Sequence, residues 1–224
     1  MEIVKLYYED DWVTIYHGDC REILPDIPKV DLVLTDPPYG EAYASGWRGR
    51  FQGEEIPNDR DTSARDAFMD SWGGPAAVFG KWSVAKWGAP RGVLVWDKGP
   101  ANGMGDLSFP WKPSWEDIAI YGDGWSGKRD PGVLRGPTMV SWSGRAGQRM
   151  HPNEKPVWLC RLLLEKAPEA HAILDPFMGS GTTLRAAKDL NRKAIGIEIE
   201  EKYAEIAANR MSQEVFDFSQ KESS

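Results

Sequence analysis

Short apolar runs alternate with amphipathic stretches along most of this 224-residue chain. Runs dominated by apolar residues predict strands at 13–19, 30–36, 91–99, 116–122, 171–177 and 193–199. Apolar positions at helical spacing predict helices at 20–27, 75–88, 156–168, 180–190 and 201–211. Because apolar strands alternate with helices, we expect an α/β fold, in which helices cover both faces of a mostly parallel sheet.

Two long stretches show no sustained period. Residues 41–61 are polar and contain glycine, which predicts a long loop. Residues 122–150 are rich in glycine, serine and basic side chains, and residues 214–224 form a polar tail that we expect to be frayed. We therefore expect one domain, 1–213, whose halves 12–121 and 151–213 flank a small insertion at 122–150.

Composition and charge bear on the partners of this domain. An apolar content of 41% is enough to bury a substantial core. The net charge of −7, taken over the whole chain, argues against a nucleic-acid partner. Within 122–156, however, six basic side chains accompany three acidic ones, so phosphate groups can be met locally. The alternative is a solvated loop whose charges bind nothing specific.

Several other classes of protein are disfavoured. No apolar run approaches the roughly 18 to 20 residues that a membrane span needs, and the first residues lack the apolar core of a signal peptide. We expect a cytoplasmic protein. Cys20 and Cys160 form no metal-ligand cluster with the three histidines, so we expect structural thiols and no metal site.

The stretch "TDPPYG" follows the predicted strand at 30–36. The two prolines end a strand, because each removes a backbone donor and fixes φ. They also hold the carboxylate of Asp36 and the ring of Tyr39 in fixed relative positions at the carboxyl edge of the sheet, where open α/β sheets bind ligands. On the plainer alternative, Asp36 is a cap and Tyr39 a packing residue.

A second candidate is the glycine loop "ILDPFMGSGTT", which joins a predicted strand to a helix. Gly179 and Gly181 allow close approach of a ligand, and the free N–H groups of the next helix favour an anionic or polar group. Thr182 stands where a phosphate-binding loop needs lysine, so ATP binding is disfavoured. Glu198, 17 residues beyond Gly181 at the end of a strand, is placed to bind both hydroxyls of a ribose. The spacing predicts a cofactor that contains a nucleoside.

Four motifs in order, "TDPPYG", "MHPNEKP", "LDPFMGSGTT" and "GIEIEEKY", resemble the S-adenosylmethionine-dependent amino-methyltransferases of DNA. The order, with the catalytic motif before the cofactor loop, is similar to the permuted β arrangement of that family. The resemblance covers nearly everything from Val13 to Arg210. It implies a Rossmann-like methyltransferase sheet, a catalytic first half, a target-recognition insertion at 122–150 and a cofactor-binding second half.

The resemblance also implies roles for individual residues. The catalytic motif is Asp36, Pro37, Pro38 and Tyr39. The residues expected at S-adenosylmethionine are Asp19, Cys20, Lys155, Asp175, Phe177, Gly179, Gly181, Thr182 and Glu198. Within this set, Asp19 would accept a hydrogen bond from the adenine amino group of the cofactor and Lys155 would lie near its carboxylate. A plain helix start at Pro156 is the alternative for Lys155.

The chemistry explains the residue types in "DPPY". An exocyclic amino nitrogen is a poor nucleophile because its lone pair is delocalised into the ring. Acceptors at its two N–H groups, the Asp36 carboxylate and the Pro37 carbonyl, favour a pyramidal nitrogen with a freer lone pair. Tyr39 would stack on a base that is flipped out of duplex DNA.

In the resembling family, Asp before Pro-Pro-Tyr more often accompanies N6 of adenine than N4 of cytosine, so adenine is favoured. Methylation at carbon 5 of cytosine needs a cysteine after proline, whereas Cys20 follows Asp19 and Cys160 follows Leu159. Two rivals stay open: an RNA amino-methyltransferase, and a binding module that has lost catalysis.

The insertion is short for this family, which implies a short target sequence or low specificity. Arg129, Arg135, Arg145 and Arg149 are the predicted DNA contacts. The family often dimerises, but no residue pattern indicates a partner face. The resemblance also places the protein in a bacterial cell or a virus-infected bacterial cell.

Overall fold

The computed structural model describes residues 5–40, 62–99, 108, 110–112, 114–136 and 154–213. Strands and helices alternate over residues 13–80 and 157–212, as the sequence predicts, whereas the described elements between residues 76 and 135 are four strands in succession. In the first half the elements are β1 (Lys5–Glu9), β2 (Val13–His17), α1 (Cys20–Ile23), the 3-10 turn η1 (Leu24–Asp26), β3 (Leu32–Thr35), α2 (Ser63–Ser71), β4 (Ala76–Gly80), β5 (Gly92–Asp97) and β6 (Trp115–Tyr121). The remaining elements are β7 (Val133–Arg135), α3 (Val157–Glu165), β8 (Ala172–Asp175), α4 (Thr182–Asp189), β9 (Lys193–Glu198) and α5 (Glu201–Ser212).

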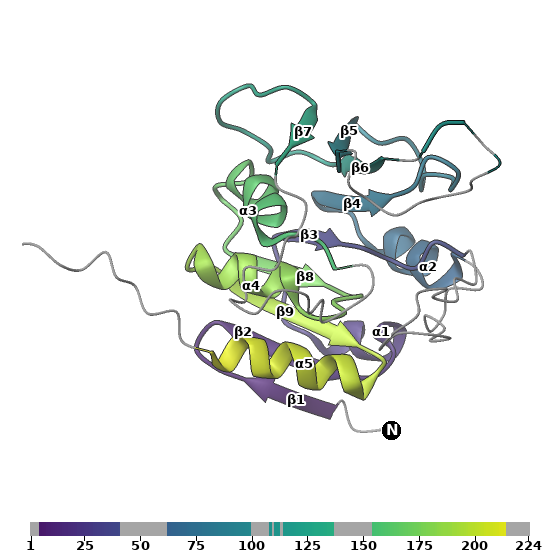
Figure 1. Ribbon diagram of the computed structural model, residues 1–224. Helices are drawn as coiled ribbons and strands as arrows, with labels where there is room; N and C mark the ends of the chain where they lie inside the picture. The colour runs from purple at the N-terminus through teal and green to yellow at the C-terminus, as the bar shows by residue number, and fades with distance from the viewer. Residues whose placement is uncertain are drawn as a thin grey trace, which may run out of the picture.

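The strands of the described residues form one sheet in the order β1-β2-β9-β8-β3-β4-β6-β5-β7 (Figure 1). The central strands β2, β9, β8, β3 and β4 run parallel to one another, whereas β1 is antiparallel to β2, and β6 is antiparallel to β4 and β5. The edge strand β7 is parallel to β5. β3 of the first half pairs in parallel with β8 of the second half, so the two halves share one sheet. This mostly parallel, Rossmann-like α/β sheet confirms the predicted fold class.

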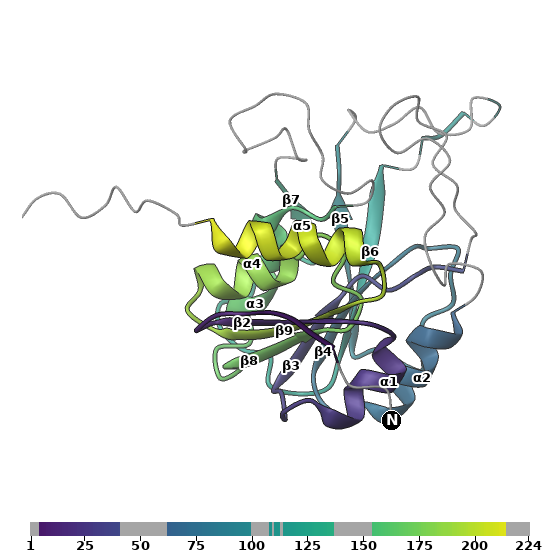
Figure 2. The same cartoon turned by 90° about the horizontal axis from the view of Figure 1, so that it is seen from below.

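Helices cover both faces of the sheet. Figure 2 shows α3, α4 and α5 on one face and α1 and α2 on the other. Alternate side chains of each central strand serve the two cores: Leu32 and Leu34 pack with α3 and α4, whereas Val33 packs with Phe68 and Met69 of α2. A strand that is buried on both faces is apolar at every position, and this explains the continuous run "LVL".

The helix predicted at 75–88 is wrong. Residues 76–80 form β4, which pairs with β3 and β6, and residues 81–88 form turns and bends. Ala77 and Phe79 face one core and Ala76 and Val78 the other, so the run has no period that separates a buried strand from a buried helix. The strands β1 and β7 and the helix α2 were not predicted from the sequence.

Several expectations fall outside the described residues. These are the loop at 41–61, the part of the insertion at 137–150, and the tail at 214–224. Among the helices that the structure describes, none has both the length and the apolar character to cross a membrane.

Candidate active site

Four carboxylates follow one another along the carboxyl edge of the parallel strands. Asp19 follows β2, Glu198 ends β9, Asp175 ends β8 and Asp36 follows β3. Because these strands are adjacent in the order β2-β9-β8-β3, the sheet brings together residues that are up to 179 positions apart in the chain. The two motifs that the sequence singled out therefore share one edge of the sheet.

Glu198 fixes the glycine loop between β8 and α4. Its Oε2 accepts a hydrogen bond from the backbone N–H of Gly179 at 2.9 Å, and its Oε1 accepts one from Glu200 at 2.9 Å. Gly179 and Gly181 have φ values of 52° and 78°, in the left-handed region that favours glycine. At Gly181, moreover, a Cβ atom would lie 2.9 Å from the Cβ of Ala207 in α5.

Asp175 links the glycine loop to the catalytic motif. Its Oδ1 accepts hydrogen bonds from the hydroxyl of Thr35 at 2.7 Å and from the backbone N–H of Phe177 at 3.2 Å. Thr35 is the last residue of β3 and directly precedes Asp36. The Thr35 hydroxyl therefore couples the ends of the two strands.

Burial raises the pKa of Asp175 to about 6 and the pKa of Glu198 to about 7. Within the described ranges, no lysine or arginine forms an ion pair with either carboxylate. A cationic ligand would supply the missing counter-charge, and a ligand with hydroxyl or N–H groups would supply hydrogen bonds. The donor set therefore fits a nucleoside cofactor that carries positive charge.

Asp36 and Tyr39 are joined directly. The Tyr39 hydroxyl donates to Asp36 Oδ1 at 2.6 Å, so the two prolines between them hold acid and ring together. Asp36 Oδ2 forms an ion pair with Nζ of Lys155. About 24% of the Asp36 side chain stays exposed, which leaves its carboxylate open to a ligand.

Lys155 lies between two acids. Its Nζ contacts Asp36 and is also 3.3 Å from Oε2 of Glu116, while Oε1 of Glu116 forms an ion pair with Lys98. The Lys155 ammonium also lies 5.2 Å from the ring centre of Phe79. The sequence predicted Lys155 near the cofactor carboxylate; in this structure its described partners are the catalytic motif and Glu116.

These charges shift one another's titration. Burial raises the pKa of Asp36, and the charge of Glu116 adds to the rise, whereas the ammonium of Lys155 opposes it. Burial also raises the pKa of Glu116, but the charges of Lys155 and Lys98 outweigh burial and bring it below its ordinary value. The pKa of Lys155 is raised because its carboxylate partners outweigh burial. The ammonium therefore stays charged throughout the physiological range.

Sequence reasoning missed Glu116 and Lys98 as members of this cluster. Each lies in a predicted strand, but nothing in the local pattern indicates that they meet. They come together because β5 and β6 form an antiparallel pair, with Trp96 opposite Glu116.

Asp19 and Cys20 begin α1 at the far end of this edge. Asp19 caps the helix by accepting from the Arg21 N–H at 2.9 Å, and it also forms an ion pair with the Arg21 guanidinium. Burial raises the pKa of Cys20 and of Cys160 to about 12, so both remain thiols at neutral pH. Neither supplies a thiolate nucleophile.

The predicted DNA contacts are described only in part. Arg135 ends β7, has a side chain that is 77% exposed, and donates to Asp97 Oδ2 from Nε at 3.0 Å. Arg129 is exposed in the bend before β7, and Arg145 and Arg149 lie outside the described residues. No cluster of acids, cysteines or histidines in the described ranges has the arrangement of a metal site.

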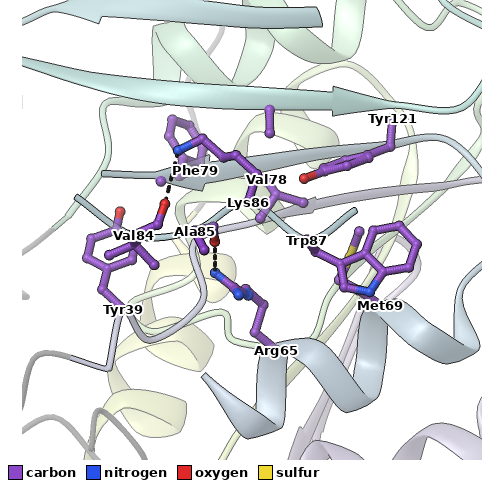
Figure 3. Close-up of a pocket in the computed structure, with 12 residues that line it drawn as sticks. Tyr39, Arg65, Met69, Val78, Phe79, Val84, Ala85, Lys86, Trp87 and Tyr121 are labelled. Atoms are coloured by element: carbon purple, nitrogen blue, oxygen red, sulfur yellow. Dashed lines mark hydrogen bonds between the residues drawn. The ribbon is translucent and has the colours of Figure 1, made fainter. Parts of the chain in front are cut away.

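A small pocket lined in part by Tyr39 lies between α2 and β4 (Figure 3). Tyr39, Trp87 and Tyr121 are among its aromatic walls. Arg65 and Lys86 border it, but Arg65 donates to the Ala85 carbonyl at 3.0 Å and Lys86 pairs with Asp117 at 2.8 Å. Its cations are therefore engaged by the protein itself.

Comparison with known proteins agrees with this geometry. Residues 114–209 match the model of the N6_N4_Mtase family, described as DNA methylase. The type II methyltransferase M.ScaI of Streptomyces caespitosus is 30% identical over 94% of this chain and 84% of its own length. The putative methylase YubD of Escherichia coli K12 is 32% identical over 87% of this chain and 88% of its own. The chain belongs to the amino-methyltransferases of DNA.

The fold is also similar to that of a solved DNA methyltransferase. The cytosine-N4-specific PvuII DNA methyltransferase superposes with a TM-score of 0.64 at 18% identity, over 94% of this chain and 90% of its own. In this family S-adenosylmethionine is the methyl donor, and it is a nucleoside cofactor that carries positive charge, as the acceptors at this edge of the sheet require. A place in restriction and modification of DNA accords with the type II methyltransferases among the relatives.

Proposed function

We propose that this protein transfers a methyl group from S-adenosylmethionine to the exocyclic N6 of adenine in duplex DNA. The observation that carries the proposal is the Asp36 carboxylate, held by Tyr39 and Lys155 beside the loop that Glu198 fixes. This arrangement supports an acceptor for an amino group beside a site for a nucleoside cofactor.

Asp36 and the Pro37 carbonyl are the proposed acceptors for the two N–H groups of the target amine. Their pull on both protons frees the nitrogen lone pair for attack, and the fixed geometry supplies much of the rate by proximity. The aromatic ring of Tyr39 stacks on the flipped base. This contact offsets part of the cost of unstacking the base, which is on the order of a few kcal/mol. Neither cysteine is needed for this reaction.

The glycine loop, Glu198, Asp175 and Asp19 hold the cofactor in this proposal. Glu198 accepts from the ribose hydroxyls, the N–H groups of the loop and of α4 meet the methionine end, and Asp19 receives the adenine amino group. Phe177 and Thr182 line the same loop, Cys20 follows Asp19, and Lys155 approaches from the Asp36 side. When bound, S-adenosylmethionine supplies an electrophilic methyl group.

Adenine is preferred over cytosine because an aspartate precedes Pro-Pro-Tyr. Both bases present an amino group beside a ring nitrogen, so the same acceptors serve N4 of cytosine, the base named for the PvuII enzyme of similar fold. For the DNA itself, we propose that Arg129, Arg135, Arg145 and Arg149 contact phosphates or base edges. We also propose that the enzyme acts in the cytoplasm.

The test is nucleoside mass spectrometry of DNA from a methylation-deficient bacterium that expresses either the wild type or Asp36→Ala. N6-methyladenine from the wild type alone supports the proposal. N4-methylcytosine would overturn the base while keeping the mechanism. No modified DNA base, from a folded protein that binds S-adenosylmethionine, would overturn the DNA activity, and methylation of added RNA would then identify an RNA enzyme.

A further inference from the structure

Glu116 occupies a position that no motif of the sequence assigns. Because β6 runs antiparallel to β4, the first residues of β6 lie at the same edge as the carboxyl ends of the parallel strands. Glu116 and Asp117 are adjacent but belong to separate ion pairs: Glu116 meets Lys155 and Lys98, whereas Asp117 meets Lys86. Glu116 is thus the acid of β6 that is linked to the catalytic motif.

The contact of Glu116 with Lys155 is unusual. Oε2 of Glu116 is buried and makes no hydrogen bond to any described residue, although Nζ of Lys155 lies 3.3 Å away. Its other oxygen is held by Lys98. One carboxylate oxygen is therefore held by Lys98, directly after β5, and the other faces the ammonium that pairs with Asp36.

Lys155 is enclosed at this point. Only 6% of the residue is exposed, and its ammonium lies over the ring of Phe79 and 5.9 Å from the ring centre of Tyr39. An ammonium has three N–H donors, and two acids share this one. If Glu116 were neutral, the full charge of Lys155 would fall on Asp36.

We infer that Glu116 is a positioning residue: it holds the Lys155 ammonium between two carboxylates, so that Asp36 does not face the full charge of Lys155 and stays free to accept a hydrogen bond from the target amino group. The inference rests on the proposed function, because it concerns the same carboxylate. Lys98 anchors Glu116 in turn, and the four side chains together carry no net charge when all are ionised.

Glu116 and Lys155 have opposite effects on the titration of Asp36. The groups that face Asp36 are Lys155 before α3, Glu116 of β6, Tyr39 of its own loop and Asp175 of β8. Since the charge of Glu116 raises the pKa of Asp36 and that of Lys155 lowers it, Glu116→Gln and Lys155→Met must shift the titration of Asp36 in opposite directions. Loss of packing alone would not produce shifts of opposite sign.

The first measurement needs no activity. In protein labelled with ¹³C at the aspartate carboxyl carbons, the Asp36 signal is assigned by its loss in Asp36→Ala and followed with pH. We expect it to titrate at lower pH in Glu116→Gln and at higher pH in Lys155→Met than in the wild type. Equal titration in the wild type and Glu116→Gln would overturn the inference, whether or not the protein methylates adenine.

The second measurement is kinetic. We expect Glu116→Gln to lower kcat for DNA methylation roughly tenfold, to move the acid limb of the rate profile to lower pH, and to leave KM for S-adenosylmethionine unchanged. Asp10→Asn is the matched control, since Asp10 pairs with Lys188 at 2.6 Å near the opposite edge of the sheet. In the Lys155→Met background, Glu116→Gln should change kcat little; an additive loss would mean that Glu116 acts only through stability.

Discussion

The hydroxyl of Thr35 donates to Oδ1 of Asp175 at 2.7 Å, across a separation of 140 residues. This buried hydrogen bond joins the strand that carries the catalytic acid to the strand that opens into the cofactor loop. Both residues are buried, so water does not replace the bond if it is lost. The hydroxyl therefore adds a side-chain link between two strands that already pair through their backbones.

Thr35→Val tests that link. The variant keeps the shape of the side chain but leaves Asp175 Oδ1 with the Phe177 N–H as its remaining described partner there, at a cost of about 1–3 kcal/mol in unfolding free energy. We expect weaker binding of S-adenosylmethionine, measured by calorimetry, and a lower Tm. Thr35→Ser retains the hydroxyl and is the matched control. Unchanged cofactor affinity and Tm in Thr35→Val would show that the hydrogen bond does not hold the site together.

Binding of S-adenosylmethionine should strengthen as pH rises through the range near 6 to 7. The pKa of Asp175 is about 6 and that of Glu198 about 7 in the free protein, so cofactor binding to the ionised pair must release protons. Calorimetry at pH 6.5 in two buffers of different ionisation enthalpy measures this release. Glu198→Gln should remove part of it and raise Kd, whereas binding without proton release would contradict the assignment of these acids to the cofactor.

The same shifts predict the stability of the free protein. The ordinary pKa values are 3.8 for Asp175 and 4.5 for Glu198, and both are raised on folding. The native state therefore binds more protons than the unfolded state between about pH 4 and 7, and the contribution of this pair to stability falls as pH rises across that window. Saturating S-adenosylmethionine should flatten the fall, as urea titrations at several pH values would show.

Local and distant features of the site differ in how far the sequence predicted them. The turn from β8 through the glycine loop to α4 was predicted correctly, because its apolar run, its glycines and its helix are contiguous. The contact of Lys155 with Asp36 spans 119 residues, and its link to Glu116 depends on which strands pair. The helix predicted at 75–88 was wrong for a different reason: residues 76–80 are apolar at every position, and a buried helix shows the same pattern as a buried strand.

Gly181→Ala should destabilise the protein for two separable reasons. The residue has a φ of 78°, and its new Cβ would lie 2.9 Å from the Cβ of Ala207, so we expect a loss of about 1–3 kcal/mol in unfolding free energy. Gly88→Ala, at a φ of 52° with no atom within 4 Å, isolates the backbone strain. Relative to Ala207→Gly alone, which carries the cost of about 1 kcal/mol of a glycine within α5, Gly181→Ala should cost less by the part due to the contact. An equal cost in both backgrounds would place the whole effect in the backbone.

Neutralising Arg145 and Arg149 together should weaken DNA binding and flatten its dependence on salt, because each phosphate contact that is lost reduces the number of counterions released. Fluorescence anisotropy with a duplex at several salt concentrations measures both quantities. Arg161→Gln is the control, since Arg161 lies on α3 within 3.9 Å of Glu165. A uniform loss of affinity over many duplex sequences indicates phosphate contacts, whereas a loss confined to one sequence indicates base contacts. Unchanged binding would remove the segment 122–150 from DNA recognition and leave the target to be read by other parts of the chain.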